Sequence, residues 1–373
     1  MKETREILSQ VAELAAGENA VLATVVDLKG SGYRLPGARM LIKANGDAYG
    51  TVSGGCLEAD VMERAKRVLA TGRAEVFTYD TTVDENSVFS LNMGCRGVMR
   101  ILLEAVNGTS EIIAALQDVW NTRRTIASAV LIARDGGELQ IGSRILMTGN
   151  SGMNATDPCG LSDRFPTLCE DLFTFSGSTS SYETIRYETA EELSEFVFEM
   201  LGPPVKLAIL GAGADAVPLA DAAWSLGWQV DVYDHRAAFL NRERFTSAEN
   251  LHLAGRDAVP KIATDELTAI VLMNHNYDRD KSMLPAAMRS DAFYVGALGP
   301  KKRTQQILEE LKEAGETFEI EQIARLRSPA GLDIGGDSPE TIAVSIIAEI
   351  QSVLKNRTGG PLKDRTAPIY DRK

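Results

Sequence analysis

The sequence predicts an α/β protein whose C-terminal part is a doubly wound parallel sheet and whose N-terminal part is a mixed α/β domain. Three observations support this prediction. The turn Gly211-Ala-Gly213 follows an apolar strand pattern and opens a helix. Asp234 ends the next strand, and strand and helix patterns then alternate along the chain. This combination is the Rossmann fingerprint in its Gly/Gly/Ala form.

A change of character at Gly202-Pro203-Pro204 marks the domain boundary. We expect the mixed α/β domain over residues 1–200, with a loop-rich stretch over 151–181 where Gly, Ser, Thr and Pro are frequent. The Rossmann-like domain is expected over 203–356, and a flexible tail over 357–373. No repeat of solenoid period is visible.

In the first domain, apolar patterns of strand length predict strands over 20–27, 74–79, 98–105 and 126–133. Asn45-Gly46 predicts a hairpin that joins strands over 38–43 and 47–52. Apolar residues at helical spacing predict helices over 57–69 and 111–120.

In the second domain, buried strands are expected over 205–210, 228–233, 269–273 and 292–298. Helices are expected over 214–226, around 284–288 and over 339–354. Ser338 is suited to cap the last helix, with Pro339 at its first position.

Composition excludes several functional classes. The 373 residues carry a net charge of −13, which disfavours binding to nucleic acid or to an anionic membrane surface. The apolar runs are too short to span a bilayer, and the N-terminal residues lack the apolar core of a signal peptide. Four cysteines without framework spacing fit a reducing compartment, so we expect a cytoplasmic protein.

The glycine turn suits a phosphate, because Gly211 and Gly213 allow close approach to a helix N-terminus. Asp234 is placed to hold a ribose hydroxyl. Asp215 argues against a dinucleotide, since its carboxylate in the first helical turn repels a pyrophosphate. A bound dinucleotide and a different ligand both remain open.

Two further segments are candidates for ligand binding. Lys301, Lys302 and Arg303 begin a helix, where cations oppose the helix dipole unless an anion docks beside them. The alternative is an ordinary solvated basic turn. Gly331–Glu340 is either a glycine-rich turn with a helix cap or a rigid loop that presents Asp333 or Asp337 to a ligand.

His275 follows the strand over 269–273, at the edge where open α/β sheets bind ligands. It is a candidate hydrogen-bond donor or general acid/base, and the candidate catalytic residue if the protein is an enzyme. A structural histidine that caps the strand is the alternative.

Cys56 and Cys95 stand in glycine-flanked turns that favour a thiolate, Cys56 near a helix N-terminus and Cys95 beside Arg96. Their spacing carries no zinc signature, and two soft ligands suit a thiophilic partner. Two small buried thiols are the alternative. We assign no role to Cys159 or Cys169.

Taken together, these motifs resemble the XdhC/CoxI family of accessory proteins of molybdenum hydroxylases, over residues 1–105 and 203–356. Tyr33 and Arg96 depart from the pattern, standing where many members have Pro and Gly. The matching segments are Gly30-Ser31, Arg34, Pro36–Met40, Gly50–Glu58, Gly94-Cys95, Gly211-Ala-Gly213, Asp234-His-Arg236, His275-Asn-Tyr277, Gly299–Thr304 and Pro329–Gly335.

The resemblance implies a chaperone that binds molybdenum cofactor, supports its sulfuration with a cysteine desulfurase, and hands it to a molybdenum hydroxylase apoenzyme. We expect a maturation factor rather than a stand-alone enzyme, and a homo-oligomer. The competing hypothesis is an NAD(P)-dependent oxidoreductase, with Asp234 on the ribose and His275 as proton carrier. Cys56 and Cys95 are the expected contacts to molybdenum. The expected cofactor-binding residues are Cys56, Cys95, Arg34, Arg39, Gly54, Gly55, Glu58, Gly211, Gly213, Asp234, His275, Lys301, Lys302, Arg303 and Asp333.

Overall fold

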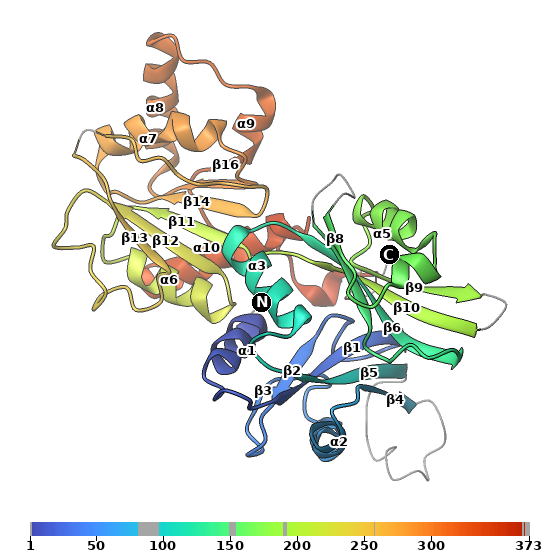
Figure 1. Cartoon of the computed structure of the whole chain (residues 1–373). Coiled ribbons are helices and arrows are strands. Elements are labelled where there is room, and N and C mark those ends of the chain that lie inside the picture. Colours follow the sequence, from blue (N-terminus) through green and yellow to red (C-terminus); the bar gives the residue numbers. More distant parts are fainter. Residues whose placement is uncertain are drawn as a thin grey trace. The chain divides into compact units, whose positions relative to one another are not determined.

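The computed structural model describes residues 2–80, 97–148, 154–188, 192–256, 258–367 and 369. The chain divides into two compact units, drawn in blue to green and in yellow to red in Figure 1. The N-terminal unit spans Glu3–Pro203, and the C-terminal unit contains Pro204–Lys373.

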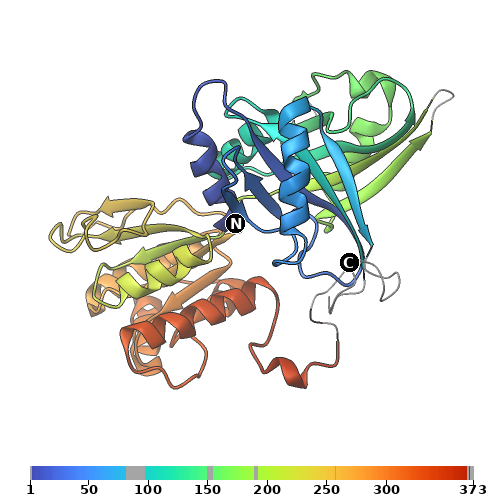
Figure 2. The same ribbon diagram turned by 90° about the horizontal axis from the view of Figure 1, so that it is seen from below.

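The first half of the N-terminal unit is a five-stranded antiparallel sheet with helices on both faces. Alternate residues of its central strand point to opposite faces, so α2 (Glu58–Thr71) covers one face and α1 (Lys2–Ala12) and α3 (Glu111–Thr122) cover the other (Figure 2). The strands lie in the order β3-β2-β1-β5-β4, with β1 Ala20–Gly30, β2 Arg39–Ile42, β3 Ala48–Gly50, β4 Glu75–Asp80 and β5 Gly97–Val106.

The second half of this unit is another five-stranded antiparallel sheet. Short helices α4 (Leu161–Arg164) and α5 (Leu168–Ser176) pack on it through an apolar cluster that includes aromatic side chains of β10. The strands lie in the order β8-β7-β6-β10-β9, with β6 Ile126–Gly136, β7 Arg144–Thr148, β8 Asn154–Thr156, β9 Tyr182–Glu188 and β10 Glu192–Leu201.

The two sheets repeat one topology, and their registers agree. Thr24 of β1 faces Arg39 of β2, and at the equivalent position Val130 of β6 faces Arg144 of β7. On the other side of the central strands, Glu104 of β5 and Glu199 of β10 also occupy equivalent positions, opposite residues 22 and 128. The N-terminal unit is therefore a structural duplication.

Even the irregularities of the two sheets correspond. Each central strand contains a β-bulge, whose extra residue is Val26 in β1 and Ile132 in β6. Both extra residues are buried in one small cluster contributed by the two sheets. Just beyond the bulges, the equivalent residues Arg100 and Glu195 form an ion pair with each other.

The two sheets are joined by ion pairs that cross from one copy to the other. Arg39 of β2 binds Glu199 of β10 at 2.5 Å, and Arg144 of β7 binds Glu104 of β5. Both guanidinium groups are buried, with side chains 8% and 5% exposed. Because a buried charge is costly unless it is paired, these crossed pairs fix how the sheets pack.

The C-terminal unit is a six-stranded parallel sheet with helices on both faces, which confirms the predicted fold class. Helices α6 (Ala216–Ser225) and α10 (Pro339–Leu354) cover one face, and α7 (Tyr277–Arg289) and α8 (Lys301–Glu313) cover the other. The order is β13-β12-β11-β14-β15-β16, with β11 Lys206–Leu210, β12 Gln229–Asp234, β13 Asn250–Leu253, β14 Thr268–Leu272, β15 Tyr294–Ala297 and β16 Leu326–Arg327. A short helix α9 (Ile320–Arg325) precedes β16, and a 3₁₀ turn (Leu362–Asp364) lies in the tail.

Most predicted elements are confirmed within one or two residues. The last helix occupies Pro339–Leu354, and Ser338 caps it by accepting a hydrogen bond from the backbone N–H of Thr341. The stretch over 151–181 contains more regular structure than the loop-rich prediction allows, because its described residues 154–181 hold β8, α4 and α5. Buried Leu168, Leu172 and Phe175 give α5 an apolar stripe that outweighs the weak helix propensity of its Ser and Thr residues.

Among the described residues, no helix combines the length and the apolar character that crossing a membrane requires.

Replacing Glu104 by Leu is expected to lower the free energy of unfolding by about 3–5 kcal/mol, because it leaves the guanidinium of Arg144 buried without a counter-charge. The double variant Glu104→Leu/Arg144→Met is expected to recover most of this loss, since it removes both charges. Urea denaturation measures both. Glu75→Gln, which breaks the exposed pair with Arg67, is the control and changes stability by about 0.5 kcal/mol or less. Equal effects of Glu104→Leu and Glu75→Gln contradict the role of the crossed pairs.

Candidate functional site

The turn after β11 is held against the neighbouring strand. Gly211 has a φ of 121°, and a Cβ atom at this position would lie 2.5 Å from the backbone oxygen of Met273. A side chain cannot be accommodated here, so the glycine is required by both conformation and space. Arg244 completes the turn by donating hydrogen bonds to the backbone oxygens of Ala212 and Gly213, at 3.0 and 3.3 Å.

Asp234 lies beside this turn, at the carboxyl end of the second strand of the unit, as the sequence predicts. The residue is 1% exposed, and its carboxylate accepts hydrogen bonds from the backbone N–H of Ala212 at 2.6 Å and from the guanidinium of Arg236 at 2.7 Å. Burial raises the pKa of Asp234, but these hydrogen bonds outweigh it and lower the pKa to about 2. Both carboxylate oxygens are thus engaged within the chain, and neither is presented to a ribose hydroxyl in this structure.

His275 and Asp215 meet at the mouth of the glycine turn. His275 follows β14 with a φ of 53°, and its Nε2 lies 3.1 Å from Oδ2 of Asp215 at the start of α6. A Cβ atom on Gly213 would lie 3.3 Å from the imidazole ring. The structure therefore brings Gly211, Gly213, Asp234 and His275 together at the carboxyl ends of the strands. This is the edge at which open α/β sheets bind ligands, and β11 and β14 are the neighbours between which the strand order reverses.

The three predicted cations at the start of α8 do not share one environment. Lys301 and Lys302 are exposed, whereas Arg303 binds Asp280 at 2.6 Å. Asp280 is buried and also accepts from the side-chain amide of Asn274 at 2.9 Å. Arg303 therefore neutralises a buried carboxylate, and the two lysines are the cations available to an anion at this helix N-terminus.

The loop after β15 and the loop after β16 line one cavity of about 540 Å³. Gly299 and Pro300 contribute from the first loop, and Asp333 and neighbouring glycines from the second. The second loop is held in place because Gly331 donates its backbone N–H to Glu349 at 2.8 Å and Ser345 donates to the backbone oxygen of Leu332 at 2.5 Å. This volume lies within the range of small-molecule and cofactor pockets.

Cys56 lies exposed in the loop that connects β3 to α2, two residues before that helix begins at Glu58. The carboxylate of Glu58 folds back over the loop. It accepts hydrogen bonds from the backbone N–H groups of Ser53 and Gly55, at 2.9 and 2.8 Å, and from the hydroxyl groups of Thr51 and Ser53. Burial raises the pKa of Glu58, but the hydrogen bonds from Ser53 and Thr51 outweigh it and lower the pKa to about 2.

Tyr33, one of the departures from the family pattern, lies against this cysteine loop. A Cβ atom on Gly54 would lie 2.5 Å from the ring carbon Cδ1 of Tyr33, and the φ of 84° at Gly54 is one that favours glycine. Gly54, Gly55 and Glu58 thus shape the loop that presents Cys56.

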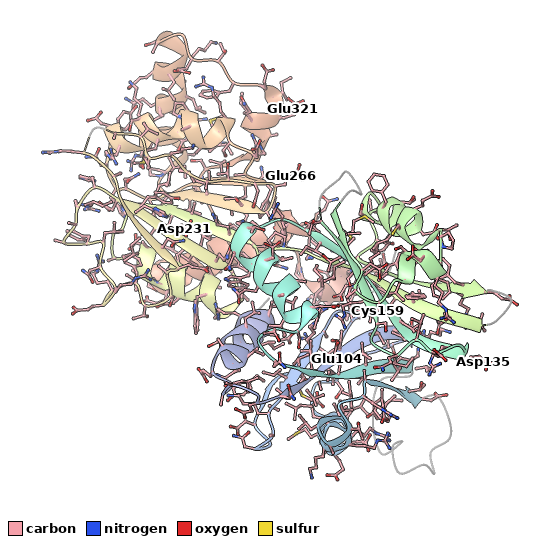
Figure 3. All side chains as sticks on the ribbon, in the orientation of Figure 1. Glu104, Asp135, Cys159, Asp231, Glu266 and Glu321 are labelled. Atoms are coloured by element: carbon pink, nitrogen blue, oxygen red, sulfur yellow. The ribbon has the colours of Figure 1, made fainter. Side chains whose placement is uncertain are left out.

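The remaining cysteines divide into three cases. Cys95 and its neighbour Arg96 lie outside the described residues, so their predicted role stays a prediction. Cys159, which lies between β8 and α4 (Figure 3), is exposed, and Cys169 is half-buried. No group of three or more His, Cys, Asp or Glu residues in the described part of the chain could hold a metal ion.

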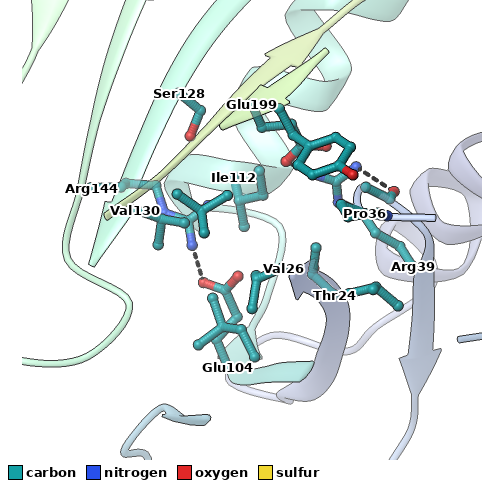
Figure 4. Close-up of a pocket in the computed structure, with 15 residues that line it drawn as sticks. Thr24, Val26, Pro36, Arg39, Glu104, Ile112, Ser128, Val130, Arg144 and Glu199 are labelled. Atoms are coloured by element: carbon teal, nitrogen blue, oxygen red, sulfur yellow. Dashed lines mark hydrogen bonds and ion pairs between the residues drawn. The ribbon is translucent and has the colours of Figure 1, made fainter. Parts of the chain in front are cut away.

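The predicted arginines of the N-terminal unit have partners inside that unit. Arg34 binds Glu3, with Nη2 2.5 Å from the carboxylate. Arg39, besides its pair with Glu199, borders a cavity of about 10 Å³ between the two sheets, which has room for about one water molecule (Figure 4). Their contacts in this structure are structural, and cofactor binding by either residue stays a prediction.

Sequence reasoning missed Arg244 and Asp280, two partners that hold these sites in shape. Arg244 reaches Gly213 across 31 positions of sequence, and Arg303 reaches Asp280 across 23. No local signal marks such partners, because the chain brings them together only when the sheet forms.

Two family models match this chain, and several known proteins are similar to it over most of its length. A model described as "XdhC and CoxI family" matches residues 13–80, and a model described as "XdhC Rossmann domain" matches residues 207–350. A Bacillus subtilis relative, whose name describes it as a probable xanthine dehydrogenase subunit, is 26% identical over 339 residues, covering 89% of this chain and 92% of its own length.

The Escherichia coli protein named "Molybdenum cofactor insertion chaperone PaoD" is 25% identical over 343 residues, covering 92% of this chain and 86% of its own length. A solved structure from Bacillus halodurans, described as a xanthine dehydrogenase, superimposes with a TM-score of 0.72 over 98% of both chains at 22% identity. The structural match shows that the two chains share a fold.

Glu58→Gln is expected to lower the free energy of unfolding at pH 7 by about 1 kcal/mol, a value reduced because the half-buried carboxylate is screened by solvent. The pKa of Glu58 is lowered from 4.5 to about 2 by folding, so the ionised carboxylate stabilises the protein above pH 4.5. This contribution is lost as the pH falls toward 2. Urea denaturation at a series of pH values is expected to show the gap between wild type and variant closing in acid. Glu63→Gln, on the exposed face of α2, is the control, and a gap independent of pH contradicts the assignment.

Proposed function

Since the chain belongs to the XdhC and CoxI family, we propose that it is an accessory chaperone that binds molybdenum cofactor as its cargo and inserts it into a xanthine-dehydrogenase-type molybdenum hydroxylase. The observation that carries the proposal is the exposed thiol of Cys56, presented at the start of a 14-residue helix by a loop of fixed shape. A thiolate at such a position is a soft ligand for a thiophilic metal centre.

Each unit, taken by itself, offers candidate contacts for the cargo. In the N-terminal unit, Cys56 would contact the molybdenum or its dithiolene, with Cys95 as the second thiol. In the C-terminal unit, Lys301 and Lys302 would bind the phosphate of the cofactor at the start of α8. The cavity of about 540 Å³ that includes the neighbouring Gly299 has the size for the organic part of such a ligand.

The role includes support for sulfuration, the exchange of an oxo ligand on molybdenum for a sulfido ligand whose sulfur comes from a cysteine desulfurase. The partners of this reaction are that desulfurase and the apoenzyme that receives the cofactor. We place the protein in the cytoplasm, where molybdenum hydroxylases of this type would be assembled, and expect a homo-oligomer.

The second candidate is an NAD(P)-dependent oxidoreductase. It is favoured by the glycine turn after β11 and by the half-exposed imidazole of His275 beside it. It is disfavoured by Asp215 at the helix start and by the engaged carboxylate of Asp234. The ligand recovered from the purified protein separates the two functions, because a pterin shows fluorescence after oxidation and a nicotinamide shows its own absorbance.

Cys56→Ala is expected to abolish or greatly reduce retention of molybdopterin while leaving the melting temperature nearly unchanged, since the side chain is small and exposed. Cys159→Ala is the matched control, because Cys159 is also exposed and also precedes a helix. Bound pterin and melting temperature are measured for both variants and for Cys95→Ala. Full retention in Cys56→Ala and Cys95→Ala rules out the thiolate model.

Lys301→Gln/Lys302→Gln is expected to weaken the binding of molybdopterin by about 1–3 kcal/mol, the scale of hydrogen bonds to charged groups, with the melting temperature unchanged because both side chains are exposed. Arg303→Gln is expected to lower the melting temperature instead, because it leaves Asp280 buried without its partner. Lys312→Gln, in the last turn of the same helix, is the control for loss of a positive charge. Equal binding by the double variant and by the control contradicts the anion site.

A further inference from the structure

The guanidinium group of Arg279 is buried and only partly satisfied. Arg279 is 8% exposed, and its Nη1 donates hydrogen bonds to the backbone oxygens of Arg256 and Ala258 at 2.6 and 3.2 Å. Its Nε and Nη2 atoms are buried and find no hydrogen-bond partner among the residues that the structure describes. These two N–H groups form the edge of a guanidinium that binds a carboxylate or a phosphate with two parallel hydrogen bonds.

Arg279 also has no carboxylate in ion-pairing distance within the described ranges. Asp280, the next residue, is bound to Arg303 and Asn274, and Asp278 on the same turn is exposed. A buried cation with an unused two-donor edge is costly unless an anion completes it.

The position of this group in the fold is one at which α/β proteins take ligands. Arg279 belongs to the first turn of the 13-residue helix α7, directly after β14. Strand β14 neighbours β11 at the point where the strand order of the sheet reverses. The dipole of α7 adds to the attraction of an anion at this end of the helix.

The two acceptors of Nη1 belong to the irregular connection from β13 to β14. Arg256 and Ala258, whose backbone oxygens accept from Nη1, are both exposed. Nη1 is therefore fastened to backbone oxygens near the surface, while Nε and Nη2 have no acceptor among the described residues.

We propose that Arg279 is the receptor of an oxyanion-binding site at the start of α7, where Nε and Nη2 bind a phosphate or carboxylate group of a small-molecule ligand. The site is separate from the lysines of α8 and does not depend on the proposed chaperone function. An oxyanion bound at this site would accept hydrogen bonds from both N–H groups of Arg279 that lack a partner. The competing role is that of a clamp which only fastens the connection from β13 to β14.

The test uses the full chain in the Lys301→Gln/Lys302→Gln background, so that the start of α8 does not contribute. Inorganic phosphate and acetate are titrated separately, with the melting temperature and the heat of binding as readouts. Stabilisation by phosphate identifies a phosphate site, and stabilisation by acetate alone identifies a carboxylate site. No response to either anion overturns the proposal.

Arg279→Lys keeps the charge but loses the two-donor edge, and it is expected to weaken binding of the responding anion at least tenfold. Arg279→Gln is expected to remove the response. Arg289→Gln, at the other end of α7 and paired with Glu316, is the matched control and is expected to bind as the background does. If Arg279→Gln does not fold, Arg279→Lys decides. Unchanged affinity in Arg279→Lys or Arg279→Gln, with or without a lower melting temperature, overturns the site in favour of the clamp.

Discussion

The crossed pairs Arg39–Glu199 and Arg144–Glu104 are the constraint on which the N-terminal unit depends. Each pair buries a positive and a negative charge between two sheets. Separating a pair would leave a buried charge without its counter-charge, which is strongly unfavourable. Arg39 is also the first residue of β2, and the hairpin of β2 and β3 leads directly into the loop of Cys56. The position of the candidate thiol therefore depends on how the sheets are locked together, although the ion pairs do not touch it.

A second theme is that the chain satisfies several of its own anion-binding turns. Glu58 fills the ring of N–H groups in the cysteine loop, and Asp234 accepts from the N–H of Ala212 in the glycine turn. Asp157 does the same at the start of α4, accepting from the backbone N–H groups of Leu161 and Ser162. These carboxylates make the loops rigid, and they leave ligand recognition to the groups around them, namely exposed side chains and the incompletely satisfied Arg279.

The architecture of the C-terminal unit could be predicted because its signals are local. An apolar strand, a glycine turn and a capped helix can each be recognised from about ten consecutive residues, as Ser338 and Pro339 show for α10.

In the N-terminal unit, β9 and β10 were not predicted, because charged and polar residues interrupt their apolar alternation. The candidate residues could be named from the sequence, but their roles could not. Whether a carboxylate such as Glu58 faces a ligand or its own backbone depends on hydrogen bonds formed in the folded chain. The duplication was not predicted either, because its sequence trace is short: Gly37-Ala-Arg-Met-Leu41 corresponds to Gly142-Ser-Arg-Ile-Leu146, and the rest of the correspondence lies in register and charge pairing.

Two identical chains that pack around a two-fold axis make every contact twice. If residue A of one chain contacts residue B of the other, then residue B of the first chain contacts residue A of the second. The N-terminal unit holds this isologous geometry within a single polypeptide. On such an axis, a residue meets its own counterpart, and here Arg100 meets Glu195. Two identical chains would place two arginines or two glutamates face to face at that point. Joining the copies in one chain removes this restriction, since each half can carry the charge that the other lacks, and a homodimer of either half alone could not make that contact.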